Sequence, residues 1–96
     1  MTITYKGEQK EIKATNRSLF KVEKFSGTPI LKLLASIEQV ENLEVIFYLI
    51  YSCTEIEDDF EEFSDKYKIS DLTKELPLVI NEISNLFVST KKKVKK

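Results

Sequence analysis

The sequence of 96 residues contains no histidine and a single cysteine, Cys53. Histidine is the side chain that most often exchanges protons near neutral pH, so histidine-based catalysis is excluded. A zinc site built from histidine and cysteine is excluded as well. One cysteine cannot form a disulfide within a single chain. The chain therefore lacks the residues of the commonest catalytic, metal and disulfide sites.

Glycine is also scarce, since Gly7 and Gly27 are the only two, and nothing resembles a glycine-rich phosphate loop. The longest uninterrupted apolar run, residues 45–51, is far shorter than the about 20 residues of a membrane-spanning helix. No signal peptide opens the chain. We therefore expect a soluble, cytoplasmic binding or structural module that is not an enzyme and uses no cofactor.

Positive and negative charges nearly cancel, with 15 Lys and Arg against 16 Asp and Glu, but they are unevenly distributed. Residues 1–32 carry a net charge of +4, residues 33–90 carry −10, and residues 91–96 carry +5. The chain as a whole is not basic, which argues against a general nucleic-acid binder. Such blocks of charge bear on association with partners more than on the fold.

The first residues predict a β-hairpin. Segments 2–5 and 11–14 alternate roughly between polar and apolar residues, and Gly7 between them supplies the positive φ of a tight turn. Because an isolated two-stranded hairpin is marginal in water, it must pack on helices or extend a sheet with another copy of the chain. Its open edges are therefore candidate contacts for self-association.

Helical spacing begins after the hairpin. A helix over residues 16–25 is predicted, with Thr15 or Asn16 as its cap and Ser26-Gly27 as its end. A second helix starts at Thr28-Pro29, and its apolar residues recur at offsets of 0, 3, 4 and 7.

Residues 40–52 form the most apolar segment. Its composition also suits a buried strand, but its length without Gly or Pro favours a helix. One face of this helix joins the predicted core, and the opposite face carries Val45, Tyr48 and Leu49. We expect this second face to be exposed and to bind a partner or another copy, with Val45, Tyr48, Leu49 and Ser52 as contacts. The alternative is that the hairpin and the last helix cover it within the chain.

Residues 55–65 hold seven acids and no base, and their apolar residues have helical spacing. The predicted helix carries like charges four residues apart, which are mildly destabilising. One interpretation is a docking face for a basic partner, and the other is a solvated surface. The residues of this acidic face are Glu57, Asp58, Glu61, Glu62 and Asp65. No glycine turn or alternating ligand spacing of a calcium loop is present, so no metal site is expected.

The last predicted helix begins near Ser70, and Pro77 either kinks it or begins a new helix. Cys53 is expected to be a small buried hydrophobic residue. The basic tail, residues 91–96, is expected to be disordered. The predicted core consists of Leu33, Leu34, Leu43, Phe47, Ile50, Ile80, Ile83 and Phe87. The predicted fold is α+β, mainly α: one domain over residues 1–90, with a short N-terminal β-hairpin followed by a bundle of about four to five helices.

The order of these elements resembles the tail assembly chaperone family of long-tailed bacteriophages and prophages. The resemblance rests on the strand, glycine and return strand of Ile3-Thr4-Tyr5-Lys6-Gly7-Glu8 and on the helix at residues 17–23. It also rests on the apolar helix ending in Leu49-Ile50-Tyr51-Ser52-Cys53, followed by an acidic helix at residues 57–63 and a last amphipathic helix. It covers about residues 2–88, and Pro77 departs from the pattern of the family.

The resemblance implies a protein of the host bacterial cytoplasm that binds the tape-measure protein and keeps it soluble during tail assembly. It also implies a frameshifted longer form that recruits the major tail protein, and the codons of Lys91-Lys92-Lys93 would suit such a frameshift. Two other classes stay open. One is a small acidic inhibitor that mimics nucleic acid and acts by binding a protein, and the other is a metal-dependent enzyme built on carboxylates.

Overall fold

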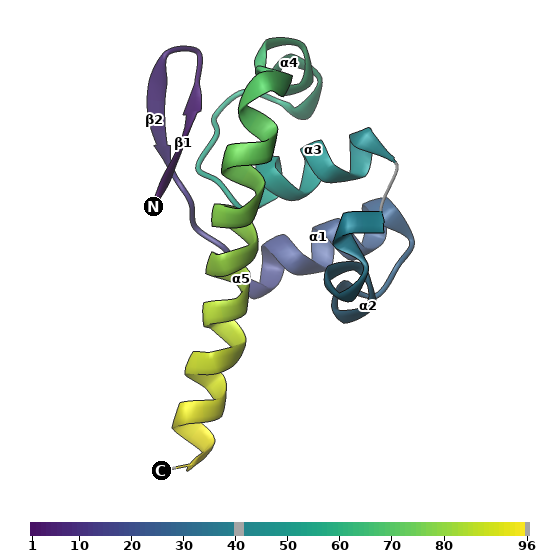
Figure 1. Cartoon of the computed structure of the whole chain (residues 1–96), viewed down its shortest axis with the longest axis vertical. Coiled ribbons are helices and arrows are strands. Elements are labelled where there is room, and N and C mark those ends of the chain that lie inside the picture. The colour runs from purple at the N-terminus through teal and green to yellow at the C-terminus, as the bar shows by residue number, and fades with distance from the viewer. Residues whose placement is uncertain (40–41, 96) are drawn as a thin grey trace.

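The computed structural model describes the backbone of residues 1–39 and 42–95 and the side chains of residues 1–37, 39 and 42–87. Within this part of the chain, a two-stranded antiparallel hairpin precedes five α-helices, which confirms an α+β, mainly α fold (Figure 1). The strands are β1 (Thr2–Tyr5) and β2 (Glu8–Glu11). The helices are α1 (Asn16–Ser26), α2 (Ile30–Ala35), α3 (Leu43–Ser52), α4 (Phe60–Lys66) and α5 (Leu72–Lys95).

The hairpin turns more tightly than the sequence pattern indicated. Tyr5 pairs with Glu8, so only Lys6 and Gly7 lie in the turn, with φ values of 54° and 76°. Two positive φ values in a two-residue loop match the right-handed twist of the strands. The prediction of a return strand at residues 11–14 is therefore wrong, because β2 begins directly after Gly7.

Residues that follow β2 pair with the segment after α3. Ile12 and Thr54 form an isolated antiparallel bridge, the Lys13 N–H donates to the Cys53 carbonyl at 2.7 Å, and the Glu55 N–H donates to the Glu11 carbonyl at 2.9 Å. These bonds occupy part of the β2 edge. They tie the hairpin to α3 within the chain and leave less of this edge for another copy.

Helix α1 begins and ends as its sequence predicts, whereas α2 has Pro29 instead of Thr28 at its cap position and ends at Ala35, before Ile37. The Thr15 hydroxyl accepts a hydrogen bond from the Ser18 N–H, and Gly27 ends α1 at a φ of 71°. In that left-handed conformation a residue with a side chain is strained. The Glu23 carboxylate then accepts from the Ile30 N–H at 2.7 Å, which satisfies one free donor at the start of α2.

The central apolar segment is a helix, and Asn42 caps it by accepting from the backbone of Glu44 and Val45. Within the predicted core, four residues are buried: Leu33, Phe47, Ile50 and Ile83. Leu34 and Ile80 are partly buried.

Two members of the predicted core are misplaced, because Leu43 and Phe87 are exposed. Leu43 is the first residue of α3, and Phe87 lies in the C-terminal half of α5. Periodicity assigns a side chain to one face of a helix, but it does not say how far the neighbouring helices extend.

The last helix is continuous through Pro77. Proline lacks the N–H that would bond the Thr73 carbonyl, and Thr73 is exposed, so solvent can reach this position. Pro77 therefore neither splits α5 nor begins a new helix. The predicted domain end at residue 90 and the predicted disordered tail at 91–96 lie outside the residues whose side chains are described, and they stay predictions.

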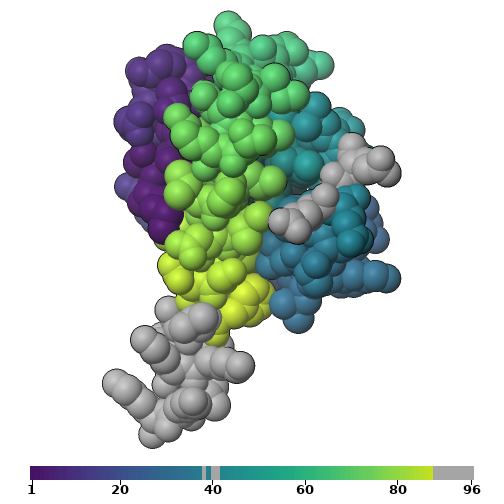
Figure 2. Space-filling model, viewed as in Figure 1, coloured from purple at the N-terminus to yellow at the C-terminus, as the bar shows by residue number. Residues whose placement is uncertain are grey.

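Glu75 joins the hairpin to the helices. The residue is 3% exposed, and its carboxylate accepts from the Tyr67 hydroxyl at 2.7 Å and from the Thr4 N–H at 2.8 Å. The register places the Thr4 N–H on the side of β1 that faces away from β2. Glu75 thus supplies the acceptor that a third strand would otherwise provide. In Figure 2, α5 lies between the hairpin and the segments of α2 and α3.

We expect Glu75→Ala to lower the free energy of unfolding by about 2–4 kcal/mol, because it leaves one buried and one partly buried donor without an acceptor. Urea unfolding followed by circular dichroism measures this change. Glu82→Ala on the same helix is the control, and its effect should stay within about 0.5 kcal/mol. Equal effects of the two substitutions would contradict the role of Glu75.

Candidate functional site

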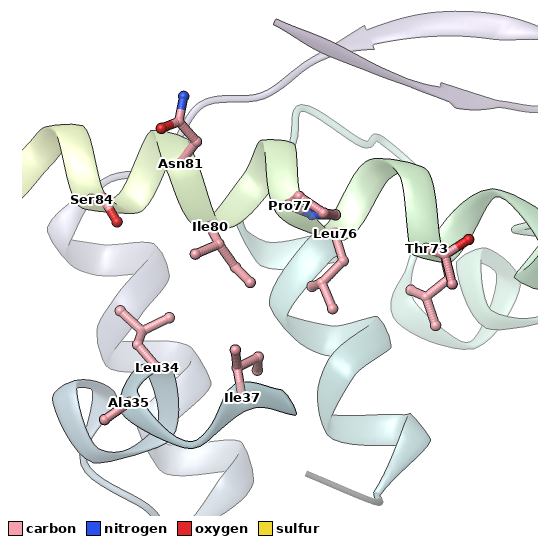
Figure 3. Close-up of a pocket in the computed structure, with 10 residues that line it drawn as sticks. Leu34, Ala35, Ile37, Thr73, Leu76, Pro77, Ile80, Asn81 and Ser84 are labelled. Atoms are coloured by element: carbon pink, nitrogen blue, oxygen red, sulfur yellow. The ribbon is translucent and has the colours of Figure 1, made fainter. Parts of the chain in front are cut away.

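An apolar groove lies between α2 and α5. Its volume is about 640 Å³. Leu34, Ala35 and Ile37 line one wall, and in Figure 3 Leu76 and Ile80 of α5 project toward them. Leu72, Thr73, Pro77, Asn81 and Ser84 complete the lining. The mostly apolar lining is suited to binding apolar side chains.

Local sequence positions both walls of the groove. Glu23 and Pro29 fix the start of α2, because Glu23 accepts the Ile30 N–H and Pro29 has the restricted φ that precedes a helix. After α2 ends, a 3-10 turn at Ile37–Gln39 directs Ile37 toward α5 (Figure 3). The spacing of four residues between Leu76 and Ile80 places both on one side of α5.

Sequence reasoning missed this groove because it assigned its residues to the core. Leu34 and Ile80 were expected to be buried together, and both have the helical spacing of core residues. In the structure they are only partly buried, and the groove separates α2 from α5. A hydrophobic stripe along one helix gives no signal for such a gap, because the gap depends on the distance between two helices.

The second face of α3 is covered within the chain, so the expectation that it is exposed is wrong. Leu49 is 0% exposed and Val45 is also buried, because α1 packs on this face. Tyr48 is partly buried and stacks on Phe25 of α1 at 4.2 Å between ring centroids. Ser52 is partly buried as well. The covering element is α1, which had not been considered for this role.

The acidic segment is also arranged differently from the prediction. The helix begins only at Phe60, with Asp59 as its cap, so Glu57 and Asp58 precede it. Of the expected pairs of like charges, only Glu61 and Asp65 lie within α4. All members of the acidic face except Asp58 are exposed.

Lys6 in the hairpin turn neutralises part of this acidic face. Its ammonium group lies 3.1 Å from Asp58 and 3.6 Å from Glu62. The Tyr5 hydroxyl also donates to Asp58 at 2.8 Å. Hydrogen bonds from Tyr5 and Lys6 lower the pKa of Asp58. Burial, followed by the hydrogen bond to Asp58, raises the pKa of Tyr5, so its hydroxyl remains a donor.

Cys53 is buried, and burial raises the pKa of its thiol to about 12. The thiolate, which is the nucleophilic form, is therefore disfavoured near neutral pH. Among the described residues, no three potential ligands of the His, Cys, Asp or Glu type come together as a metal site. None of the described helices has both the length and the apolar character needed to cross a bilayer.

Comparisons with protein-family models, with curated proteins and with solved structures found no match to this chain. The function is therefore argued from the groove, the charged surfaces and the resemblance in the order of elements.

We expect the contact of Asp58 with Tyr5 and Lys6 to make stability depend on pH. The pKa of Asp58 is lower in the folded chain than its ordinary value of 3.8. The contact therefore stabilises the fold fully above pH 3.8, and this stabilisation is lost as the pH falls through the pKa of Asp58 in the folded chain. When the pH is lowered from about 6 to about 3, the free energy of unfolding should therefore fall less in Asp58→Asn than in the wild type.

Urea unfolding at a series of pH values tests this expectation. Asn85→Ala, an exposed neutral change on α5, is the control and should keep the response of the wild type. An Asp58→Asn chain with the full acid response of the wild type would contradict the assignment.

Proposed function

We propose that this chain is a tail assembly chaperone of a long-tailed phage or prophage. In this proposal the groove between α2 and α5 holds an apolar helical segment of the tape-measure protein and keeps it soluble in the bacterial cytoplasm. The observation that carries the proposal is the apolar groove, which an isolated chain leaves open to solvent. Exposed apolar surface of this kind favours the binding of another apolar element.

The dimensions of the groove fit a short helix. Its wall on α5 extends from Leu72 to Ser84, which corresponds to roughly 18 Å at the rise of an α-helix. A client helix of about three turns would match this length and present apolar residues at offsets of 3 and 4. Leu34 and Ile37 would contact it from the opposite wall.

The fold supports the same function, because an N-terminal hairpin followed by helices is the architecture that the resemblance implies. A chaperone of this kind needs no catalytic residue and no cofactor. Recruitment of the major tail protein by a frameshifted longer form is part of the proposal. Lys91-Lys92-Lys93, whose codons would allow it, lie outside the residues with described side chains.

The alternative of an acidic inhibitor that mimics nucleic acid has less support. Such a protein needs exposed carboxylates spaced like phosphates, but Lys6 neutralises Asp58 and Glu62. Of the acidic face, only Glu61, Glu62 and Asp65 lie in α4, a helix of two turns.

We expect Ala35→Glu to weaken binding of a labelled apolar peptide from the tape-measure protein by at least about tenfold, because a carboxylate would lie against the bound apolar helix. Ala35 is exposed at the groove wall, so the substitution leaves the core intact. Fluorescence anisotropy measures the affinity, and light scattering measures how well the chain prevents aggregation of the client.

Leu31→Glu is the matched control, because Leu31 lies on the same helix, is 65% exposed and does not line the groove. This variant should bind the peptide like the wild type. Two results would reject the proposed site: a wild-type chain that does not bind tape-measure peptides, or an equal loss of binding in both variants.

A further inference from the structure

The outer side of α1 carries a basic face made of Arg17, Phe20, Lys21 and Lys24. The four residues have the offsets 0, 3, 4 and 7, which place them on one side of the helix. All four are exposed. This basic face is separate from the groove, which is lined by α2, the turn that follows it, and α5.

The positive charges of the basic face are not balanced by neighbouring acids. Among the residues with described side chains, none of the three cations forms an ion pair. Glu23, the one acid in α1, instead accepts the Ile30 N–H at the start of α2. Arg17 lies in the first turn of α1, where the helix dipole disfavours a cation. The helix dipole favours Lys24 in the last turn of α1, but it does not account for Arg17.

Phe20 adds an apolar contact beside these charges. It lies between Arg17 and Lys24 along the helix axis, at one edge of the basic face, and it is 60% exposed. An exposed aromatic residue next to cations is typical of a protein-binding surface, in which an apolar anchor lies beside charged residues.

We infer that the basic face of α1 binds an acidic helical segment of a partner protein, in which Asp or Glu residues flank an apolar position that receives Phe20. Acidic side chains of the partner would pair with Arg17, Lys21 and Lys24. Such pairs orient the partner and increase the rate of association. This surface can bind while the groove holds its own client.

The distribution of charge favours a short acidic helix over a nucleic acid. The basic face spans residues 17–24, about 11 Å along α1, whereas α4 lies at the top of the view in Figure 1. A long polyanion that passes beyond α1 would meet repulsion from the chain, which has a net charge of −10 over residues 33–90.

Two other occupants fit the basic face less well. A second copy could offer the acids of α4, but no large apolar side chain of α4 is exposed to receive Phe20. A helix that lies on an anionic bilayer needs a broad apolar face. Phe20 is the one apolar residue of the basic face, so this face is too narrow for a bilayer.

A synthetic helical peptide of about 16 residues, with Glu on both sides of a row of Leu, is the probe for this inference. We expect it to bind the full chain and to lose at least about tenfold in affinity when Lys21 is changed to Glu. Phe20→Ala should also weaken binding, and higher salt should weaken it further. A peptide with Gln in place of Glu should bind at least about tenfold more weakly than the acidic peptide.

Lys68→Glu, an exposed charge reversal outside α1, is the matched control and should leave the affinity unchanged. Circular dichroism establishes that each variant is folded. The inference is overturned if the acidic peptide does not bind, or if Lys21→Glu and Lys68→Glu lower the affinity for this peptide equally. The inference would also be overturned if a single-stranded oligonucleotide or anionic vesicles bound the chain more tightly than the acidic peptide does. Self-association in light scattering that Lys21→Glu abolishes would overturn it as well.

Discussion

The carboxyl group of Glu75 is the contact on which the arrangement of this chain depends. A two-stranded hairpin has too little apolar surface to be stable alone, so it must be fixed to the helices. Glu75 does this by accepting the Thr4 N–H from the hairpin and the Tyr67 hydroxyl from the end of α4. Burial, followed by the hydrogen bond to Glu75, raises the pKa of Tyr67, so its hydroxyl remains a donor. One side chain of α5 thus joins the end of α4 to the hairpin, which is distant in the sequence.

Aromatic packing extends this connection across the molecule. Tyr5 of β1 lies 5.1 Å from Phe63 of α4, and Phe63 lies 5.4 Å from Tyr51 of α3. Further along α3, Tyr48 stacks on Phe25 of α1. Aromatic pairs at such distances contribute beyond the area they bury. They connect α1, α3, α4 and the hairpin.

Two surfaces with different chemistry remain available on this frame. The groove between α2 and α5 is apolar and suits an apolar helix, whereas the basic face of α1 is charged around one exposed aromatic residue. The acidic residues around α4 are partly neutralised by Lys6. A chain with a small net charge therefore presents surfaces of different chemistry.

Local signals in the sequence determined the helices and some of their ends. Asn42 capping α3 and Gly27 ending α1 act through backbone groups within a few residues, and such effects are visible in a linear pattern. Tertiary structure alone decided which faces are covered: Leu49 is buried on the face of α3 where Tyr48 stacks on α1, Phe87 is exposed, and Leu34 and Ile80 line a groove. Periodicity describes one helix at a time, whereas burial depends on the length and distance of its neighbours. The same reason explains why Glu75 gave no signal, since its partners come from β1 and from the end of α4.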